Sequence, residues 1–533
     1  MSMPIQDGAW ESTRGRAGRR ATATATRTRG SGDEAVPIQE ATIASLRTAM
    51  SAGRLTSVEL TRFYLSRIDL LNASGPELRA VIEINPDALR DAAELDAERE
   101  RGRVRGPLHG LPLLVKDNLD TVGPLHTTAG STALLGSRPE RDATVVTRLR
   151  QAGAVVLGKS NLSGWISGSG GRTARGGQCR NPYQLDRSPG GSSSGSAVGV
   201  SANLCAAAIG TETVGSILDP ASLNGVVGIK PTVGLTSRAG MIPGMPSMDT
   251  VGPIGRTVAD AAAVLGPLTG VDPLDPATAA SGDHRYTDYT RFLDPNGLRG
   301  ARIGIPRRGY FGENAHADAV GEEAIRLLAA LGATVVDDVE LPSPGDLADR
   351  FDVLGIVQFR EAKHHKNVYL ARTPGEHPRS LTELIEFNRE HADAELVHFG
   401  QQALEMIDAG GDDLTDPAYL EALATMHRLT RDEGIDAALG RHGLDALMLP
   451  STQPAWKIDL VNGDPDVMSS ALVPGLAGYP AVSLPAGWAH GLPVGVTFTA
   501  SAWSEPKLIT LASAFEHAAR ARRVPGFTSP AVG

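Results

Sequence analysis

Residues 188–197 read SPGGSSSGSA, and the chain continues a short distance later with GTETVGSI at residues 210–217. A flexible linker is one interpretation of the first stretch, because Gly/Ser-rich segments form mobile coils. However, the turn-forming sequences RNPY and DRSP, at residues 180–183 and 186–189, lie just before it or overlap its start. Long loops inside a compact domain are usually functional. We therefore expect a glycine-serine turn that holds a serine in an unusual backbone geometry.

A third segment, GLPLLVKDN at residues 110–118, also contains a candidate functional residue. Its apolar run predicts a buried strand, and Lys116 follows that run directly. A lysine amine that is removed from water has a lowered pKa and can act as a neutral base. In the segment at residues 210–217, Ser216 follows a glycine, at a place where backbone N–H groups can converge on a negatively charged oxygen. The three segments thus supply a base, a constrained hydroxyl and an anion-stabilising turn.

The elements around these segments predict the fold class. Short apolar strands alternate with amphipathic helices, which indicates an α/β fold with a large twisted mixed β-sheet covered by helices on both faces. Residues 300–440 are more charged and more helical, so we expect an appended helical layer there. The predicted helices span residues 56–72 (with a capping box at Thr56 and Glu59), 141–151 and 196–209, and a further helix begins at residue 87. The predicted strands span residues 80–84, 111–115 and 154–157.

Composition narrows the classes of function. The chain has 533 residues, a formal net charge of −10 and 4 % aromatic residues, which argues against nucleic-acid binding. Its two cysteines, Cys179 and Cys205, exclude a disulfide framework and a four-ligand zinc site. No run of apolar residues is long enough to span a membrane. Residues 1–36 are expected to form a disordered tail; Arg19-Arg20 is not followed by an apolar export region, so a cytoplasmic location is predicted.

Three other motifs are better explained without a function of their own. Residues 153–160, GAVVLGKS, match the phosphate-binding P-loop pattern, but their spacer is apolar and β-favouring, which predicts a strand. Residues 191–195, GSSSG, match a nucleophile elbow centred on Ser193, yet no apolar strand precedes them. Glu361, His364 and His365 lie together on a predicted helix, where a solvated face is expected.

Together, the segments at 110–118, 188–197 and 210–217 resemble the amidase signature family of serine hydrolases. The resemblance extends from about residue 40 to 525, and residues 37–525 would then be a single domain. Within the family, the chain is most similar to bacterial peptide amidases, which remove the terminal carboxamide from peptides and release ammonia. Further matching segments are GVVGIKPT at 225–232, GYP at 478–480, GLPVGV at 491–496, ARGGQ at 174–178, RNPY at 180–183 and SAWSEPKL at 501–508.

The resemblance implies a set of residue roles. Ser216 would be the nucleophile, Ser192 a bridging serine that follows a cis peptide bond, and Lys116 the base. The backbone N–H groups of Thr213, Val214, Gly215 and Ser216 would hold the oxyanion. The residues expected to contact the substrate are Gly191, Ser193 and Asp219. No metal or organic cofactor is implied; the partner would be a small-molecule or peptide amide, and the protein a monomer or homodimer.

The chain also departs from the family pattern. Val214 stands where Gly or Asp is frequent, Asp219 belongs to a pair that often contains Arg, and Gly164 replaces a common Glu. A carboxylate at position 219 would oppose a negative charge at Ser216. Other functions therefore remain open: an aryl-amide or ester hydrolase, an amide-forming acyltransferase on the same site, the glutamine-hydrolysing subunit of a tRNA amidotransferase, or a pseudo-hydrolase that binds amides without turnover.

Overall fold

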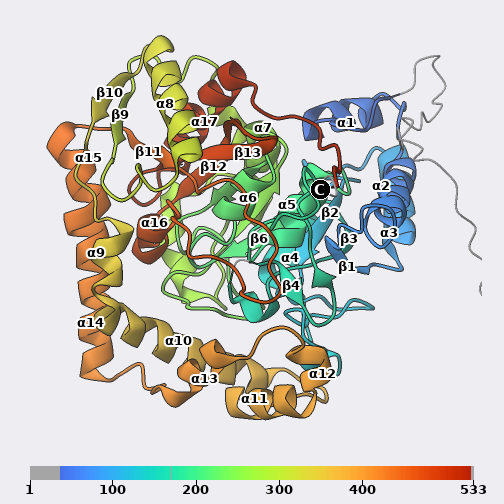
Figure 1. The fold of residues 1–533 in the computed structure, drawn as a ribbon. Coiled ribbons are helices and arrows are strands. Elements are labelled where there is room, and N and C mark those ends of the chain that lie inside the picture. Colours follow the sequence, from blue (N-terminus) through green and yellow to red (C-terminus); the bar gives the residue numbers. More distant parts are fainter. Residues whose placement is uncertain (1–35, 169, 530–533) are drawn as a thin grey trace, which may run out of the picture.

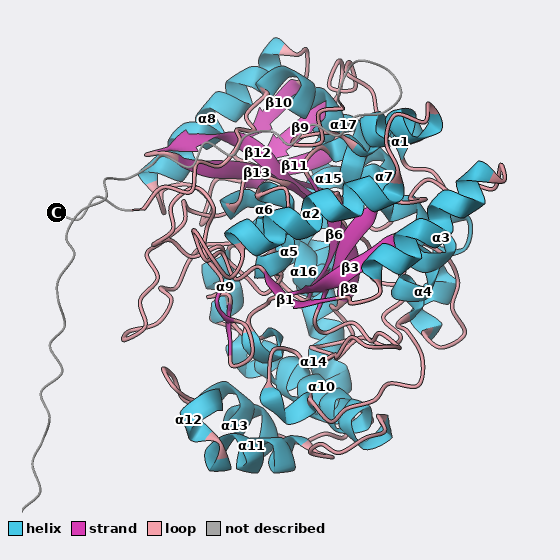
Figure 2. Cartoon of the chain, turned by 90° about the vertical axis from the view of Figure 1, so that its right-hand side faces the viewer, coloured by secondary structure: helices cyan, strands magenta, loops and turns pink. Residues whose placement is uncertain are grey.

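The structure is a computed structural model that describes residues 36–168 and 170–529. The tail expected over residues 1–36 lies outside the described residues except for Val36. An eleven-stranded mixed sheet runs through the molecule, and helices lie on both of its faces (Figures 1 and 2). This arrangement confirms the predicted α/β class. No helix in the described part of the chain is long and apolar enough to cross a membrane.

The large sheet has the strand order β1-β3-β2-β6-β8-β7-β12-β13-β11-β9-β10, and a two-stranded hairpin of β4 and β5 stands apart from it. Strand β2 lies between β3 and β6 and is parallel to both. The strands are β1 (Val81–Ile84), β2 (Pro112–Lys116), β3 (Val155–Ser160), β4 (Arg172–Thr173), β5 (Gly177–Gln178), β6 (Ala207–Glu212), β7 (Val227–Lys230), β8 (Thr250–Gly255), β9 (Arg302–Ile305), β10 (Thr334–Asp337), β11 (Ala446–Pro450), β12 (Ala481–Ala489) and β13 (Leu492–Thr499).

The helices fall into those that cover the sheet and those of an outer layer at the bottom of Figure 1. They are α1 (Ile43–Ser51), α2 (Ser57–Leu71), α3 (Ala88–Glu100), α4 (Thr144–Gln151), α5 (Ser194–Ser201), α6 (Leu218–Leu223), α7 (Val258–Leu268), α8 (Ala315–Ala330), α9 (Pro344–Ala348), α10 (Phe351–Arg372), α11 (Leu381–Glu390), α12 (Ala392–Glu395), α13 (Gln402–Ala409), α14 (Pro417–His427), α15 (Asp436–His442), α16 (Leu472–Ala477) and α17 (Glu505–Ala519).

Most sequence-based elements are present, with two differences. The helix predicted for residues 196–209 is instead the short helix α5, followed by a turn and strand β6. An alanine- and valine-rich run suits either a buried helix or a buried strand, so composition alone could not divide it. The helical layer predicted for residues 300–440 begins later, at α9. Before it, β9 and β10 extend the sheet, and α8 packs against the sheet.

The parallel pairing of β2 with β6 explains how distant residues come together. Lys116 is the last residue of β2, and Glu212 is the last residue of β6. Since parallel strands end at the same edge of a sheet, the residues that follow each strand meet there. All of β2 and β6 is buried, so this edge lies inside the molecule.

Helix α5 reaches this edge because its side chains are small. All eight of its residues are buried. A Cβ atom added to Gly195 would lie 2.1 Å from the carbonyl oxygen of Ala80 and 2.5 Å from the amide nitrogen of Asn161. Only glycine fits such a close approach of backbones. The glycine-serine sequence is therefore a packing requirement as well as a turn.

We expect Gly195→Ala to lower the free energy of unfolding by about 1–3 kcal/mol, because the methyl group has no space. Chemical denaturation measures this change. The control is Gly440→Ala in α15, where an added Cβ meets nothing within 4 Å; this variant should be neutral or slightly more stable, since alanine favours helix. Equal stability of both variants would contradict the packing described for α5.

Candidate active site

Lys116 lies at the buried edge of the sheet with its amine surrounded by oxygen atoms. Its side chain is 0 % exposed. Its Nζ lies 2.8 Å from Ser192 Oγ, 3.0 Å from Ser193 Oγ, and 3.1 and 3.0 Å from the carbonyl oxygen and Oγ1 of Thr211. Asn118 Nδ2 donates to the same Thr211 hydroxyl at 3.1 Å. The amine is thus held in place by the strand ends and by the turn before α5.

Burial lowers the pKa of Lys116 well below its ordinary value, because a charged amine loses its hydration inside the protein. The negative charges of Glu212 and Asp249 act in the opposite direction, but they are the smaller effects. No carboxylate forms an ion pair with Lys116 among the described residues. The electrostatics therefore favour the neutral amine, the form that can accept a proton.

The bridging position has the expected backbone. The peptide bond between Gly191 and Ser192 is cis, and Ser192 is 1 % exposed. The next residue, Ser193, is fully buried and its hydroxyl donates to the carbonyl oxygen of Thr211 at 3.0 Å. The contacts of Ser193 with Lys116 and Thr211 favour a role in holding the lysine, and its expected contact with the substrate stays a prediction.

Ser216 lies in the turn between β6 and α6, next to Ser192. Its carbonyl oxygen accepts a hydrogen bond from the amide of Ser193 at 3.0 Å. Gly215 has φ +82°, a conformation that favours glycine. Ser216 keeps a partly exposed side chain, whereas Ser192 is buried. Among the described residues, no hydrogen bond joins the hydroxyls of Ser192 and Ser216.

The same turn offers unpaired backbone donors. In the described part of the chain, the amides of Thr213, Val214 and Ser216 donate to no protein acceptor. Glu212 holds the end of the turn in place, because its Oε2 accepts from the amides of Ile217 at 2.7 Å and Leu218 at 2.9 Å. Free N–H groups on a glycine turn are suited to binding an oxyanion.

Asp249 is a site residue that sequence reasoning missed. Its Oδ1 accepts from the hydroxyl of Thr213 at 2.5 Å, and its Oδ2 accepts from the amide of Gly244 at 2.8 Å. Asp249 is 1 % exposed and lies just before β8, the antiparallel neighbour of β6. The only available sequence signal was a lone aspartate at a strand start, so the contact becomes visible only in the folded chain.

Asp219 lies beside the turn, in surroundings that favour its protonated form. Its Oδ1 accepts from Ser469 Oγ at 2.8 Å, and a Cβ on Gly215 would lie 2.4 Å from its Oδ2. Burial raises the pKa of Asp219 well above the ordinary value; Ser469 acts against this shift and Glu212 adds to it. A protonated carboxyl group carries no charge, so this shift reduces the expected repulsion of an oxyanion.

Two of the three set-aside motifs have structural roles that are described here, one of them different from the prediction; the third contains Ser193, described above. The P-loop-like residues form β3, and Lys159 donates to the carbonyl oxygen of Leu119 at 2.5 Å. Glu361 was expected on a solvated helical face, which is wrong. It is 2 % exposed and accepts from the amide of Ser247 at 2.9 Å and the hydroxyl of Tyr419 at 2.8 Å. The helical layer covers this face of α10.

Comparison with known proteins agrees with this geometry. Residues 59–509 match the family model described as Amidase. The chain belongs to the amidase signature family. A probable amidase of Arabidopsis thaliana is 42 % identical over 501 residues, which cover 92 % of each chain. The native peptide amidase of Stenotrophomonas maltophilia superposes with a TM-score of 0.86 at 51 % identity, covering 92 % of this chain and 99 % of that one.

A further structure shows the peptide amidase PAM in complex with the competitive inhibitor chymostatin. It superposes with a TM-score of 0.87 at 51 % identity and covers 92 % of this chain and all of that one. The protein is therefore an amidase, a hydrolase of carbon–nitrogen bonds that resembles peptide amidases in structure. Both the family and the sheet confirm the resemblance drawn from the sequence.

The raised pKa of Asp219 predicts a pH-dependent difference in stability. The folded state holds the proton more tightly than the unfolded state, so wild-type stability falls as pH rises above the ordinary aspartate pKa of about 4. Asp219→Asn does not titrate. We expect its free energy of unfolding to rise relative to wild type between pH 4 and 8, measured by denaturant titration at several pH values. Asp283→Asn, at an exposed position, serves as the control and should track the wild type.

Proposed function

We propose that this amidase hydrolyses the terminal carboxamide of peptides through Lys116, Ser192 and Ser216. The observation that carries the proposal is the 2.8 Å approach of the buried Lys116 amine to Ser192 Oγ, beside the turn that contains Ser216. A serine hydroxyl is a weak nucleophile and needs a base. The peptide preference is supported by the similarity to peptide amidases, one of them in complex with the competitive inhibitor chymostatin.

The proposed reaction begins with proton transfer through the two serines. Ser216 Oγ attacks the carbonyl carbon, its proton passes to Ser192 Oγ, and the Ser192 proton passes to Lys116 Nζ. The carbonyl oxygen becomes an oxyanion held by the free amides of Thr213, Val214 and Ser216; the Gly215 amide, also expected there, is bonded to Glu212. The relay then returns a proton to the amide nitrogen, the C–N bond breaks and ammonia leaves. Water hydrolyses the resulting Ser216 ester by the same relay.

The remaining residues support this chemistry indirectly. Ser193 and Thr211 position the amine, and Asp249 fixes Thr213 within the oxyanion turn. We expect the Asp219 carboxyl, which lies beside Gly215, and Gly191, which precedes the bridging serine, to contact the carboxamide. We expect the protein to act without a metal or organic cofactor, because the relay supplies both the nucleophile and the base.

Two alternatives use the same site differently. An aryl-amide or ester hydrolase, or an amide-forming acyltransferase, would share the Ser216 ester but differ in the group that enters or leaves. A pseudo-hydrolase would bind amides without forming the ester. The departures at Val214 and Asp219 motivated that alternative, but Val214 packs into an apolar cluster and the pKa of Asp219 is raised, which favours its uncharged form. Both observations favour a working hydrolase.

A screen for ammonia release tests the function. We expect hydrolysis of amidated peptides, and much slower turnover of aliphatic amides, aryl amides and glutamine. Ser216→Ala should lose activity by at least about 1,000-fold while keeping its fold, since it removes the nucleophile. A fluorophosphonate probe should label the wild type and not this variant. Full activity of Ser216→Ala would refute the assignment, and a wild type that is neither labelled nor active would favour the pseudo-hydrolase.

The pKa of Lys116 predicts the pH profile. Protonation removes the base, so kcat/KM should fall on the acid side and reach its plateau at a pH well below 10.5, the ordinary lysine value. Lys116→Arg carries a permanent charge and should be inactive at every pH. Lys457→Arg, at an exposed position, is the matched control and should keep the wild-type profile. Near-normal turnover by Lys116→Arg between pH 7 and 9 would place the base elsewhere.

A further inference from the structure

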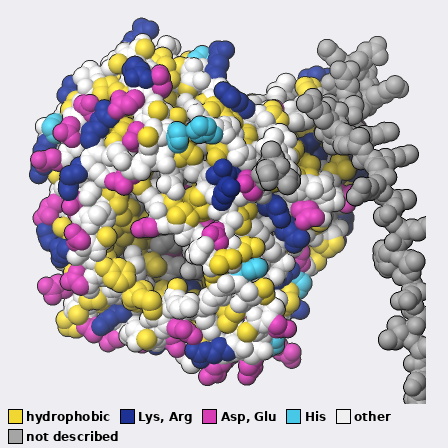
Figure 3. All heavy atoms as spheres, in the orientation of Figure 1, with side chains coloured by type: hydrophobic (Ala, Val, Ile, Leu, Met, Phe, Trp, Pro, Cys, Tyr) yellow, Lys and Arg dark blue, Asp and Glu magenta, His cyan; other side chains and the backbone are white. Residues whose placement is uncertain are grey.

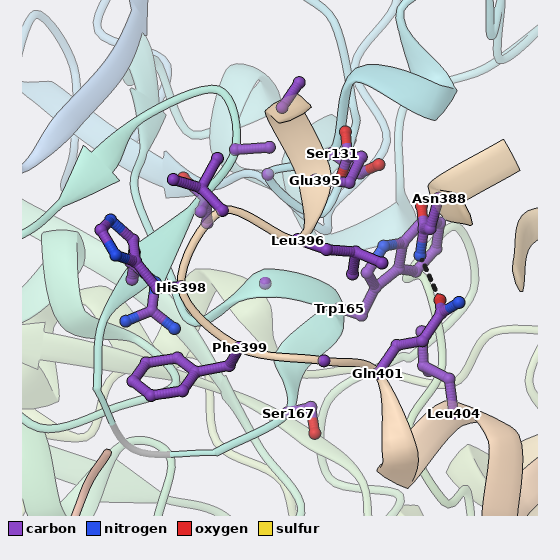
Figure 4. Close-up of a pocket in the computed structure, with 18 of the residues that line it drawn as sticks. Ser131, Trp165, Ser167, Asn388, Glu395, Leu396, His398, Phe399, Gln401 and Leu404 are labelled. Carbon is purple, nitrogen blue, oxygen red and sulfur yellow. Dashed lines mark hydrogen bonds between the residues drawn. The ribbon is translucent and has the colours of Figure 1, made fainter. Parts of the chain in front are cut away.

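A hollow separates part of the helical layer from the rest of the molecule. Figure 3 shows the surface hollowed between the body and the layer. A pocket of about 470 Å³ lies between them, with Trp165 on the wall from the body and Leu396 and Phe399 on the wall from the layer (Figure 4). The layer is therefore not packed continuously onto the body, and the polar contacts that α10 makes with the body stand out.

Lys366 is a buried lysine of α10 that the proposed reaction does not use. Its side chain is 5 % exposed, and its Nζ donates to the carbonyl oxygen of Pro243 at 3.0 Å. Among the described residues, it forms no salt bridge with a carboxylate. Removing an amine from water costs free energy unless it is well paired. A lysine that is buried with this one hydrogen bond therefore requires an explanation.

One peptide group carries this contact to a second buried side chain. Its C=O, from Pro243, accepts from Lys366. Its N–H, from Gly244, donates to Asp249 Oδ2 at 2.8 Å. A trans peptide group points its C=O and its N–H in opposite directions, so the two side chains lie on opposite sides of it. Asp249 Oδ1 in turn accepts from the hydroxyl of Thr213 at 2.5 Å. These contacts form one hydrogen-bond chain, the Lys366 chain, from α10 to the oxyanion turn.

The peptide group is fixed against the pair that it adjoins. A Cβ atom added to Gly244 would lie 2.8 Å from Thr213 Oγ1 and 2.9 Å from Asp249 Oδ1. Only glycine allows the backbone to approach so closely. Hydrogen bonds that follow one another in a buried chain also strengthen each other. A displacement at the α10 end is therefore expected to reach the turn.

A second contact from α10 holds the same loop. Glu361, five residues before Lys366 on the helix, accepts from the amide of Ser247 at 2.9 Å. The loop at residues 243–249 is thus attached to α10 near both of its ends, through Pro243 and through Ser247. Because a helix is rigid, the two contacts together set the position of the loop relative to the sheet.

The charges of Asp249 and Lys366 offset each other. Asp249 is 1 % exposed, and an uncompensated carboxylate beside Thr213 would oppose an oxyanion at the neighbouring amides. Burial lowers the pKa of Lys366 to about 8, and the negative charge of Asp249 acts against this shift. The lysine is therefore mostly protonated at neutral pH and loses its charge at mildly alkaline pH.

The other ionisable groups near this pair do not change charge in the same range. Arg238, which also interacts with Asp249, stays protonated. Burial lowers the pKa of His365 to about 4 and raises the pKa of Glu361, so both shifts favour uncharged forms. The groups that interact with the pair, directly or through one another, are Lys116, Arg238, Glu361, His365 and Tyr419.

We infer that Lys366 is a positioning residue of the reaction, which holds the amides of the oxyanion turn through the Lys366 chain and offsets the charge of Asp249. This inference rests on the proposed function, because an oxyanion forms only when Ser216 attacks a carbonyl group. The negative oxygen is present in the transition state and absent from the bound substrate. Loss of the chain should therefore lower kcat and leave KM nearly unchanged.

Lys366→Met removes the charge and the donor and keeps a long side chain. We expect kcat for an amidated peptide to fall about tenfold, the order of one lost hydrogen bond to a charged group. Lys363→Met is the matched control. Lys363 lies three residues earlier on α10 and donates to the carbonyl oxygen of Gly410 at 3.1 Å, on a different segment. This control should keep the wild-type kcat.

The pH profile separates this role from a simple loss of packing. Since the pKa of Lys366 is about 8, wild-type kcat should decline above pH 8 towards the level of Lys366→Met. The variant itself should show no decline there. A packing defect would instead lower kcat equally at every pH and leave the decline in place, which would contradict the inference.

Thr213→Val cuts the same chain at its other end and keeps the backbone of the turn. It should also lower kcat. Because both substitutions interrupt one chain, the double variant with Lys366→Met should lose less than the product of the two single effects. If the two effects multiply, the residues act independently and the inference is wrong.

The fluorophosphonate probe keeps the two proposals apart, because its reaction with Ser216 also places an oxygen in the oxyanion turn. If the wild type hydrolyses amidated peptides and Lys366→Met matches Lys363→Met, the inference is wrong while the proposed function stands. If the wild type hydrolyses no amide but is labelled, the proposed function fails, and the labelling rates of the same variants decide the inference. If the wild type is neither active nor labelled, both are wrong.

Discussion

A lysine amine buried among oxygen atoms is the constraint on which the site depends. Lys116 lies among hydroxyl and carbonyl oxygens and has no paired carboxylate in the described structure. Burying a charged amine is expensive, so this environment stabilises the neutral form. That environment requires three parts of the chain to meet: the end of β2, the end of β6 and the turn before α5. The parallel pairing of β2 with β6 and the small residues of α5 bring them together.

Local sequence was sufficient to find what lies within one segment. The strand before Lys116, the capping box at Thr56 and the glycine-serine turn each depend on neighbouring residues, and each is present in the structure. The division of residues 196–209 into α5 and β6 was missed because alanine and valine suit both elements when buried. The choice there is made by packing against β2, which no local pattern encodes.

Contacts between distant segments account for the rest of what the sequence could not show. Asp249 reaches Thr213 across neighbouring strands, and Glu361 is buried because Tyr419 and Ser247 close over it. A charged residue on a helix is usually solvated, so its burial can be recognised only when the covering element is known. The pocket at Trp165 is of the same kind, since its walls come from segments more than 200 residues apart.

Two of the three departures from the family pattern, Val214 and Asp219, are accommodated by one segment. Ser469 donates to Asp219. Gly475 packs closely on the turn, because a Cβ added to it would lie 3.0 Å from both Val214 Cγ2 and the carbonyl oxygen of Thr213. Helix α16 thus approaches the oxyanion turn closely enough to hold the Val214 side chain, while Ser469, three residues before the helix, binds the carboxyl of Asp219. Changes at both positions are therefore coupled through α16, and the turn keeps its backbone donors free.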